Sequence, residues 1–381
     1  MKLKVRESGI ELLKIIAVFL IVISHAAQVL YMQQLYDICP KAYINLNHVT
    51  TNIQHLILIF FRYFGTLGNC IFFISSAWFL CDSNKRNTKK ILQMIIDVWI
   101  ISIIFLLVFV ISGVNLSTDE IIKSIVPTTF STTWFITCYL LLYSIHPYLN
   151  ILVENISQEE LLKINIVTLT IYFGGGYLIK RDLFFGNDLI LFIVIYLLIA
   201  YIKKYLNYVF SNNKLNVTLV LLGILGNTGI VLLTNFLGLK VGGLLSEHMI
   251  HWSRNSSPFL LLIAIGLFNL FKNKKFTSKE VNKLSALSLM IYLIHENSLV
   301  KNYFYPEVFS VIYDKLGYSH IVIWVVLLAA CIFIISALLG FIYKYMFQRI
   351  TKIIADKFVD IMYIKVEKIV NSFIKKTRIT G

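Results

Sequence analysis

The chain has 381 residues, of which 58% are hydrophobic and only 14% are charged. An ordinary soluble domain is about 25% charged, so a water-soluble fold of this composition would expose large apolar patches. The net charge of +15 would raise the question of nucleic acid on a soluble protein, but the basic residues follow a membrane topology and we expect no nucleic-acid partner. The few prolines and glycines favour an all-α, multi-pass integral membrane protein over a lipid-facing barrel.

Ten apolar runs are long enough to cross a bilayer as helices. The fifth is weakened by Gly174-Gly175-Gly176, and the eighth is short. Residues 1–27 also have features of a signal peptide, but the apolar run continues to Tyr31 and favours an uncleaved first span. In chain order the predicted spans are 10–30, 56–81, 91–112, 134–153, 163–181, 188–206, 216–237, 257–272, 284–304 and 320–346.

The positions of Lys and Arg predict that both chain ends are cytoplasmic. With the N-terminus inside, the predicted cytoplasmic segments hold 25 of the 35 Lys and Arg residues and the outer segments hold 8, as the positive-inside rule requires. Residues 6–346 then form the transmembrane domain. Residues 347–381 form a basic tail, in which Lys alternates with Ile, Val and Phe at helical spacing. We expect this tail to lie as an amphipathic helix on the inner leaflet.

Three ionisable side chains interrupt the first predicted span, namely Glu11, Lys14 and His25. Each such residue costs about 2.5–3.5 kcal/mol at the bilayer centre. At about 100° per residue they share one helix stripe, with Lys14 only ~6 Å inside the membrane and His25 ~22 Å inside. Lys14 alone is also compatible with snorkelling while it pairs with Glu11. His25 alone is also compatible with a role in helix packing.

Later spans add more polar residues. Arg62 in the second span lies near the predicted depth of His25, and Ser75 and Ser76 lie near the depth of Lys14, although serines also serve in helix packing. His295 stands beside Glu296 in the ninth span, an arrangement that can tune proton transfer. The outer loop 238–257 holds His248 and His251 without a clear third ligand, so we predict no metal site. The five cysteines show no disulfide spacing.

These residues occur in a pattern that resembles the acyltransferase 3 family of membrane-bound enzymes, which O-acylate envelope sugars. The first span has a basic residue eleven positions before a histidine, as in the family's opening motif. Lys14 stands where the family usually has arginine, and Ser75-Ser76 stands where it usually has Ser-Gly. The resemblance covers about residues 6–346 and includes Lys14 to His25, Arg62, Phe72 to Ser76, Trp134 to Asn150, and Ser288 to His295.

The resemblance implies an enzyme of the bacterial plasma membrane. Its donor substrate would be acetyl-CoA or another acyl-CoA, with no bound cofactor. Its acceptor would be a hydroxyl of an extracytoplasmic glycan or a glycolipid. Lys14, supported by Glu11, would hold the anionic end of the donor. His25 would act as general base or transient acyl carrier, and Arg62 would stabilise the oxyanion or orient the acceptor. The cavity wall would include Ser75, Tyr139, Tyr292 and His295.

Two other functions fit a many-spanned protein with polar residues inside its helices. A transporter or flippase for an envelope precursor also uses intramembrane Arg, His and Glu, but such proteins often have two matching halves, and none is visible here. A glycan polymerase usually has a large outer loop, whereas the longest predicted outer loops have only about 20–25 residues. Acyl transfer is therefore the leading hypothesis.

Overall fold

The computed structural model describes residues 7–130, 132–179 and 188–377. Every regular element in these ranges is helical. Nine of the described helices are long and apolar enough to cross a membrane. The prediction of an all-α, multi-pass membrane protein is therefore confirmed.

The first half of the chain builds the centre of the molecule and one of its sides. Some of the long helices begin with a capping residue. The side chain of Asn52, for example, accepts hydrogen bonds from backbone amides at the start of α3. The elements are α1 Gly9–Val29, α2 Gln33–Ile38, η1 Pro40–Ala42, α3 Ile53–Leu80, α4 Thr88–Ile111, α5 Thr118–Ile125, α6 Trp134–Asn155, α7 Gln158–Leu169, η2 Thr170–Gly175 and α8 Gly176–Leu178.

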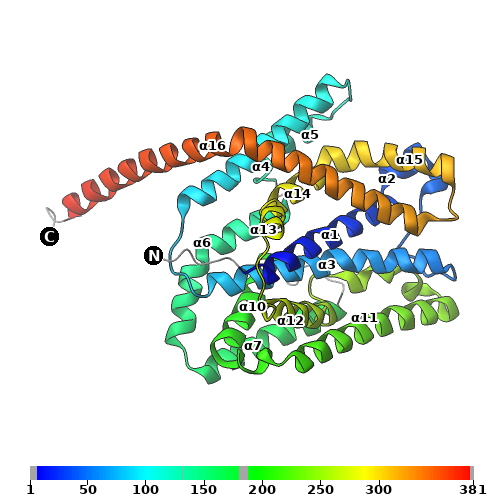
Figure 1. Ribbon diagram of the computed structural model, residues 1–381, viewed down its shortest axis with the longest axis horizontal. Coiled ribbons are helices and arrows are strands. Elements are labelled where there is room, and N and C mark those ends of the chain that lie inside the picture. The colour runs from blue at the N-terminus through cyan, green and yellow to red at the C-terminus, as the bar shows by residue number, and fades with distance from the viewer. Residues whose placement is uncertain (1–6, 131, 180–187, 378–381) are drawn as a thin grey trace.

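The second half surrounds that centre. Two of its helices, α11 and α16, are the longest in the described chain and lie on opposite sides of α1 (Figure 1). The elements are α10 Asp188–Tyr201, η3 Ile202–Leu206, η4 Val209–Ser211, α11 Asn213–Val241, η5 Gly243–Glu247, η6 Met249–Ser253, α12 Pro258–Lys272, α13 Lys279–Ser285, α14 Ser288–His295, η7 Val300–Phe304, α15 Tyr305–Leu316 and α16 Ile321–Thr377.

Helix α1 is the central element, with α3, α12, α13, α14 and α16 packed around it (Figure 1). Its closest partner is α3, because two glycines of α3 face it. A Cβ atom on Gly65 would lie 2.7 Å from Oγ of Ser24, and one on Gly68 would lie 2.6 Å from the carbonyl oxygen of Ala17. Small residues allow such close helix contacts in membranes. The polar stripe of α1 is therefore enclosed by protein.

The prediction of one continuous span over 284–304 was wrong. The chain there forms three short pieces, α13, α14 and η7, before α15 begins at Tyr305. Glu296, which follows α14, carries a buried charge that must be paired, and the interruption lets the chain place it beside its partners. The weak fifth span is also irregular, because its glycines lie in the π-helical turn η2 and in α8.

The predicted boundary between membrane domain and tail does not coincide with any break in the helix. Helix α16 runs without interruption from Ile321 to Thr377. Between Gln348 and Asp360 it contacts the start of α4, where Lys89 Nζ lies 2.8 Å from Oδ1 of Asp360. Apolar residues of this part, among them Ile354 and Phe358, are exposed. Contact of the tail with the inner leaflet remains a prediction.

Candidate functional site

A polar cavity of about 510 Å³ surrounds His25 and is called the His25 cavity here. Its wall combines side chains from α1, α3, α6, α10, the segment before α12, and the interrupted segment after α14. The lining residues are Ser24, His25, Gln28, Arg62, Gly65, Thr66, Asn69, Trp134, Asp188, Leu191, Ser253, Arg254, Asn255, Ser256, Glu296 and Lys301. Its size lies within the range of small-molecule sites.

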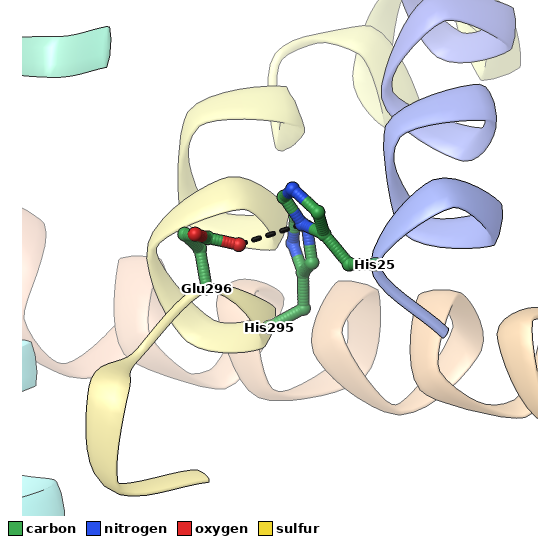
Figure 2. Close-up of side chains that lie close together, drawn as sticks. All are labelled: His25, His295 and Glu296. Atoms are coloured by element: carbon green, nitrogen blue, oxygen red, sulfur yellow. Dashed lines mark hydrogen bonds and ion pairs between the residues drawn. The ribbon is translucent and has the colours of Figure 1, made fainter. Parts of the chain in front are cut away.

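His25 is held at the wall of this cavity by residues of α14 and the turn that follows it (Figure 2). Its Nδ1 atom lies 3.1 Å from Nε2 of His295 and 2.6 Å from Oε2 of Glu296. The other carboxylate oxygen of Glu296 lies 2.6 Å from Nζ of Lys301. We call His25, His295, Glu296 and Lys301 the His25 relay. The buried carboxylate is thus paired, as burial of a charge requires.

The hydrogen bonds of the relay determine which nitrogen of His25 is free to react. Nδ1 of His295 lies 2.7 Å from the carbonyl oxygen of Ile291. A carbonyl only accepts, so this Nδ1 carries the hydrogen, and Nε2 of neutral His295 is an acceptor. Neutral His25 then donates from Nδ1 and keeps a lone pair on Nε2. Figure 2 shows that nitrogen pointing away from His295 and Glu296. Such an imidazole can take a proton from a hydroxyl.

The same three side chains also have the composition of a metal site. One ligand atom from each of His25, His295 and Glu296 lies within 4.8 Å of the others. The ammonium of Lys301, however, already lies beside the carboxylate, and a divalent cation would be repelled by it. We therefore interpret the cluster as a hydrogen-bonded relay. The absence of a metal remains a prediction.

Arg62 lines the same cavity as His25, as their similar predicted depths indicated. Its Nη1 atom donates to the carbonyl oxygen of Ser24 at 2.7 Å and to Oγ of Ser24 at 2.9 Å. Its guanidinium also stands over the ring of Tyr31, with 5.5 Å to the ring centroid. These contacts hold the guanidinium of Arg62 next to the residue before His25. There it can stabilise the negative charge that develops on a substrate oxygen during a reaction in the cavity.

A second cavity, of about 330 Å³, lies near the other end of α1 and is called the Lys14 cavity here. Lys14 and Lys90 are its cationic residues, and most of its wall is apolar. Lys14 Nζ lies 3.4 Å from Oε1 of Glu11. The lining residues are Lys14, Val18, Ile21, Phe72, Ser76, Lys90, Met94, Phe135, Ile136, Tyr139, Ser285, Ala286, Ser288, Leu289 and Tyr292.

Aromatic rings lie between the two cavities. The ring of Phe135 stacks on that of Phe73, with centroids 5.1 Å apart, and lies 5.7 Å from the ring of Tyr292. The ring of Tyr292 in turn lies 5.9 Å from that of His295. Phe135 lines the Lys14 cavity, whereas its neighbour Trp134 lines the His25 cavity. We call Phe73, Phe135 and Tyr292 the aromatic partition.

The structure places most of the predicted site residues at a cavity. His25 and Arg62 line one cavity, and Lys14, Tyr139 and Tyr292 line the other. Three predicted residues do not line either of these two cavities in the described structure: Glu11, Ser75 and His295. Glu11 lies behind Lys14, where Ser285 Oγ donates to its Oε2 at 2.5 Å, and His295 supports His25 from behind.

Ser75 lines neither the His25 cavity nor the Lys14 cavity. It is fully buried, and its neighbour Ser76 lines the Lys14 cavity instead. One step along a helix turns the side chain by about 100°, so only one of two adjacent serines can face the cavity. Lys301, Asp188 and Asn255 also line the His25 cavity, although no sequence motif indicated a role for them. Their location just outside the predicted apolar stretches, or near their ends, was the only available signal.

The model of the acyltransferase 3 family, described as an acyltransferase domain, matches residues 7–346. The chain belongs to the acyltransferase 3 family. No curated protein and no solved structure matched it. This acyltransferase is therefore a multi-pass membrane protein that uses an acyl donor and an acceptor.

Proposed function

We propose that this acyltransferase moves an acyl group, by preference acetyl, from cytoplasmic acyl-CoA to a hydroxyl of an extracytoplasmic glycan or lipid-linked sugar. Its location would be the bacterial plasma membrane. The observation that carries the proposal is the His25 relay, which leaves one imidazole nitrogen free beside a polar cavity. Membership of the acyltransferase 3 family supports the acyl chemistry.

The two cavities suit the two substrates. Lys14 and His25 are eleven residues apart on α1, which is ~16 Å along the helix axis. The Lys14 cavity offers cations at its wall, which suit the phosphates of CoA, and an apolar interior. Ser288 and Tyr292 line it with buried hydroxyls, which suit the amides of a pantetheine arm. The His25 cavity is rich in polar groups, as a sugar requires.

The proposed reaction assigns a step to each residue. Nε2 of His25 accepts the proton of the sugar hydroxyl, whose oxygen forms a bond to the thioester carbonyl carbon. Glu296 stabilises the imidazolium that results, and Arg62 stabilises the negative charge on the carbonyl oxygen. The carbon–sulfur bond then breaks, and the proton passes from His25 to the leaving CoA thiolate. The products are the sugar ester and free CoA.

The test uses sealed inside-out vesicles from cells that contain the envelope acceptor. Vesicles with the wild-type chain or with His25→Ala receive acetyl-CoA labelled in the acetyl group. We expect label in lumenal glycan or glycolipid with the wild type and none with His25→Ala, because the general base is lost. His48→Ala, which removes an exposed histidine from the loop before α3, serves as the matched control and should keep activity.

Two results would contradict the proposal. Equal labelling by wild type and by well-expressed His25→Ala protein would remove His25 from the chemistry. Absence of label with wild type, for acetyl-CoA and for a panel of longer acyl-CoAs, would refute acyl-CoA as the donor. In a third assay without acceptor, label that stays on the purified wild-type protein but not on His25→Ala would show that His25 carries the acyl group covalently instead of acting as a base.

A further inference from the structure

A second group of polar residues lines the His25 cavity and takes no part in the relay. It consists of Asn69 on α3, Asp188 at the start of α10, and Asn255 in the segment before α12. Nδ2 of Asn255 donates to Oδ1 of Asp188 at 2.9 Å. Nδ2 of Asn69 lies 3.4 Å from Oδ1 of Asn255. We call these three residues the Asp188 cluster.

The cluster orients the carboxylate of Asp188 but leaves most of its capacity to accept hydrogen bonds unused. A carboxylate can accept about four hydrogen bonds, and the described residues supply one, to Oδ1. Oδ2 has no hydrogen-bond partner among them. Asp188 is half-buried and lines the cavity, and it begins helix α10, where the helix dipole favours a negative charge. The cavity therefore presents a fixed acceptor to whatever molecule enters it.

Trp134 stands in the wall of the same cavity. Its ring is held by Phe135, with centroids 5.8 Å apart. A sugar ring has an apolar C–H face and a rim of hydroxyl donors. An indole can cover the first, and a carboxylate flanked by amides can bind the second. The described wall also holds three cations: Lys301 pairs with Glu296, and Arg62 and Arg254 donate to the carbonyl oxygens of Ser24 and Ile179. A phosphate or a carboxylate of an anionic sugar placed at Oδ2 of Asp188 would be repelled by that carboxylate.

We propose that the Asp188 cluster is the acceptor-binding site, and that it selects a neutral sugar. Oδ2 of Asp188 accepts a hydrogen bond from a hydroxyl of the sugar unit whose other hydroxyl is presented to His25, and Trp134 covers the ring. Asp188 is thus a specificity-determining residue of the acceptor. This assignment rests on the proposed function, because it names the substrate class of the same cavity.

The test compares two soluble probes of equal shape and different charge. Methyl β-D-glucoside is neutral, and methyl β-D-glucuronide carries a carboxylate. Each is titrated as acceptor of labelled acetyl with purified wild-type protein in proteoliposomes, and as competitor against labelling of lumenal glycan in the inside-out vesicles. We expect the glucoside to act at lower concentration than the glucuronide with the wild-type chain.

Asp188→Asn changes the charge and keeps the shape. We expect it to raise the acceptor KM, or the competing concentration, of the glucoside at least about tenfold, the effect of losing one hydrogen bond to a charged group. The preference against the glucuronide should shrink by a similar factor, which a merely structural role of Asp188 would not produce. The KM for acyl-CoA should stay within about twofold. Asp119→Asn, which removes an exposed carboxylate paired with Lys123 on α5, is the matched control.

The outcomes separate this proposal from the proposed function. A wild-type protein that transfers no acetyl group refutes the proposed function itself. A wild-type protein that does transfer it overturns only the present proposal in either of two cases. In one, Asp188→Asn keeps the same ratio between the two probes. In the other, neither probe competes with the native acceptor, because the site then does not recognise a sugar ring.

Discussion

At the scale of single residues, Glu296 joins His25 to Lys301 within the His25 relay. It contacts His25 through one oxygen and Lys301 through the other, at 2.6 Å each. An unpaired carboxylate in this buried place would cost several kcal/mol of desolvation free energy. The ion pair with Lys301 offsets this cost, so Glu296 can be ionised. The ionised group can then orient His25 and stabilise it when it becomes charged, as a carboxylate does for the histidine of a serine-protease triad.

Glu296→Gln tests this role. It keeps the shape of the side chain and removes its charge, so the imidazolium of His25 loses its counter-ion. We expect kcat to fall at least about 100-fold, measured as acetyl transfer in proteoliposomes. Glu159→Gln, an exposed carboxylate that pairs with Lys163 on α7, should keep wild-type activity. Full activity of Glu296→Gln would mean that the carboxylate only pairs with Lys301.

Lys14 is the residue for which the snorkelling alternative must be tested. It lines its cavity and lies near Glu11, a geometry compatible with both interpretations. If it binds a phosphate of the donor, Lys14→Ala should raise the KM for acyl-CoA about tenfold with little change in kcat. Lys14→Arg keeps the charge and should be tolerated. An unchanged donor KM in Lys14→Ala would leave Lys14 as a membrane anchor.

Helical periodicity explains which site residues could be predicted. Lys14 and His25 fall on one stripe of α1, so their burial inside the protein followed from the cost of exposing them to lipid. The choice between Ser75 and Ser76 depends on the rotation of α3 about its own axis, which its two glycines fix against α1. The contact between His25 and Glu296 joins residues 271 positions apart, and only tertiary packing determines it.

At the scale of elements, the approach of α1 to α3 determines the geometry of the His25 cavity. Gly65 allows it, because Ser24 lies where a Cβ atom would stand. The same close contact lets Arg62 bond to Ser24. A single methyl group at position 65 would thus change the positions of Arg62 and His25 together.

Gly65→Ala should lower stability by about 1–3 kcal/mol, the usual cost of overpacking, and should reduce acetyl transfer more than expression. Gly229→Ala on α11 is the matched control, since a Cβ atom there meets nothing within 4 Å. The measurements are the thermal midpoint in detergent and the transfer rate per mole of folded protein. Equal midpoints for the two variants would show that α1 and α3 can move apart without cost.

The interrupted segment from α13 to α15 is the element that sequence patterns described least well. Its apolar run reads as one span, because hydropathy averages over a window and does not register where the helix ends. The structure ends α14 at His295 and starts η7 at Val300. The interruption places Glu296 and Lys301 at one cavity, which a pattern of apolar residues does not encode.

At the scale of the whole molecule, the aromatic partition separates the cavity with the cationic wall from the cavity with the relay. Under the proposed function the acyl group passes this partition, so the space beside Phe135 limits its size. Phe135→Ala should raise the rate with butyryl-CoA relative to acetyl-CoA several-fold, measured with a series of acyl-CoAs. Phe341→Ala, at an exposed position of α16, should leave the series unchanged. An unchanged series in Phe135→Ala would place the acyl path elsewhere.

The architecture as a whole could be predicted further than the site. Within the described residues, nine of the apolar runs form helices long enough to span, because length and hydropathy alone decide that property. In Figure 1 helices α1 and α16 run in opposite directions, so that α1 starts and α16 ends on the same side. Which side faces the cytoplasm rests on the distribution of Lys and Arg and remains a prediction.

The separation of Lys14 and His25 along α1 has an electrical consequence for the proposed reaction. The sugar hydroxyl reaches the reacting carbon from the outer side and gives up its proton there, whereas the CoA thiolate leaves that carbon towards the cytoplasmic side. If that proton travels back through the protein to the thiolate, the exchange moves no net charge. If each side instead exchanges protons with its own solution, every turnover carries one positive charge outward, against a resting potential that costs about 2.3 kcal/mol per 100 mV. The membrane voltage would then act on the enzyme as an inhibitor.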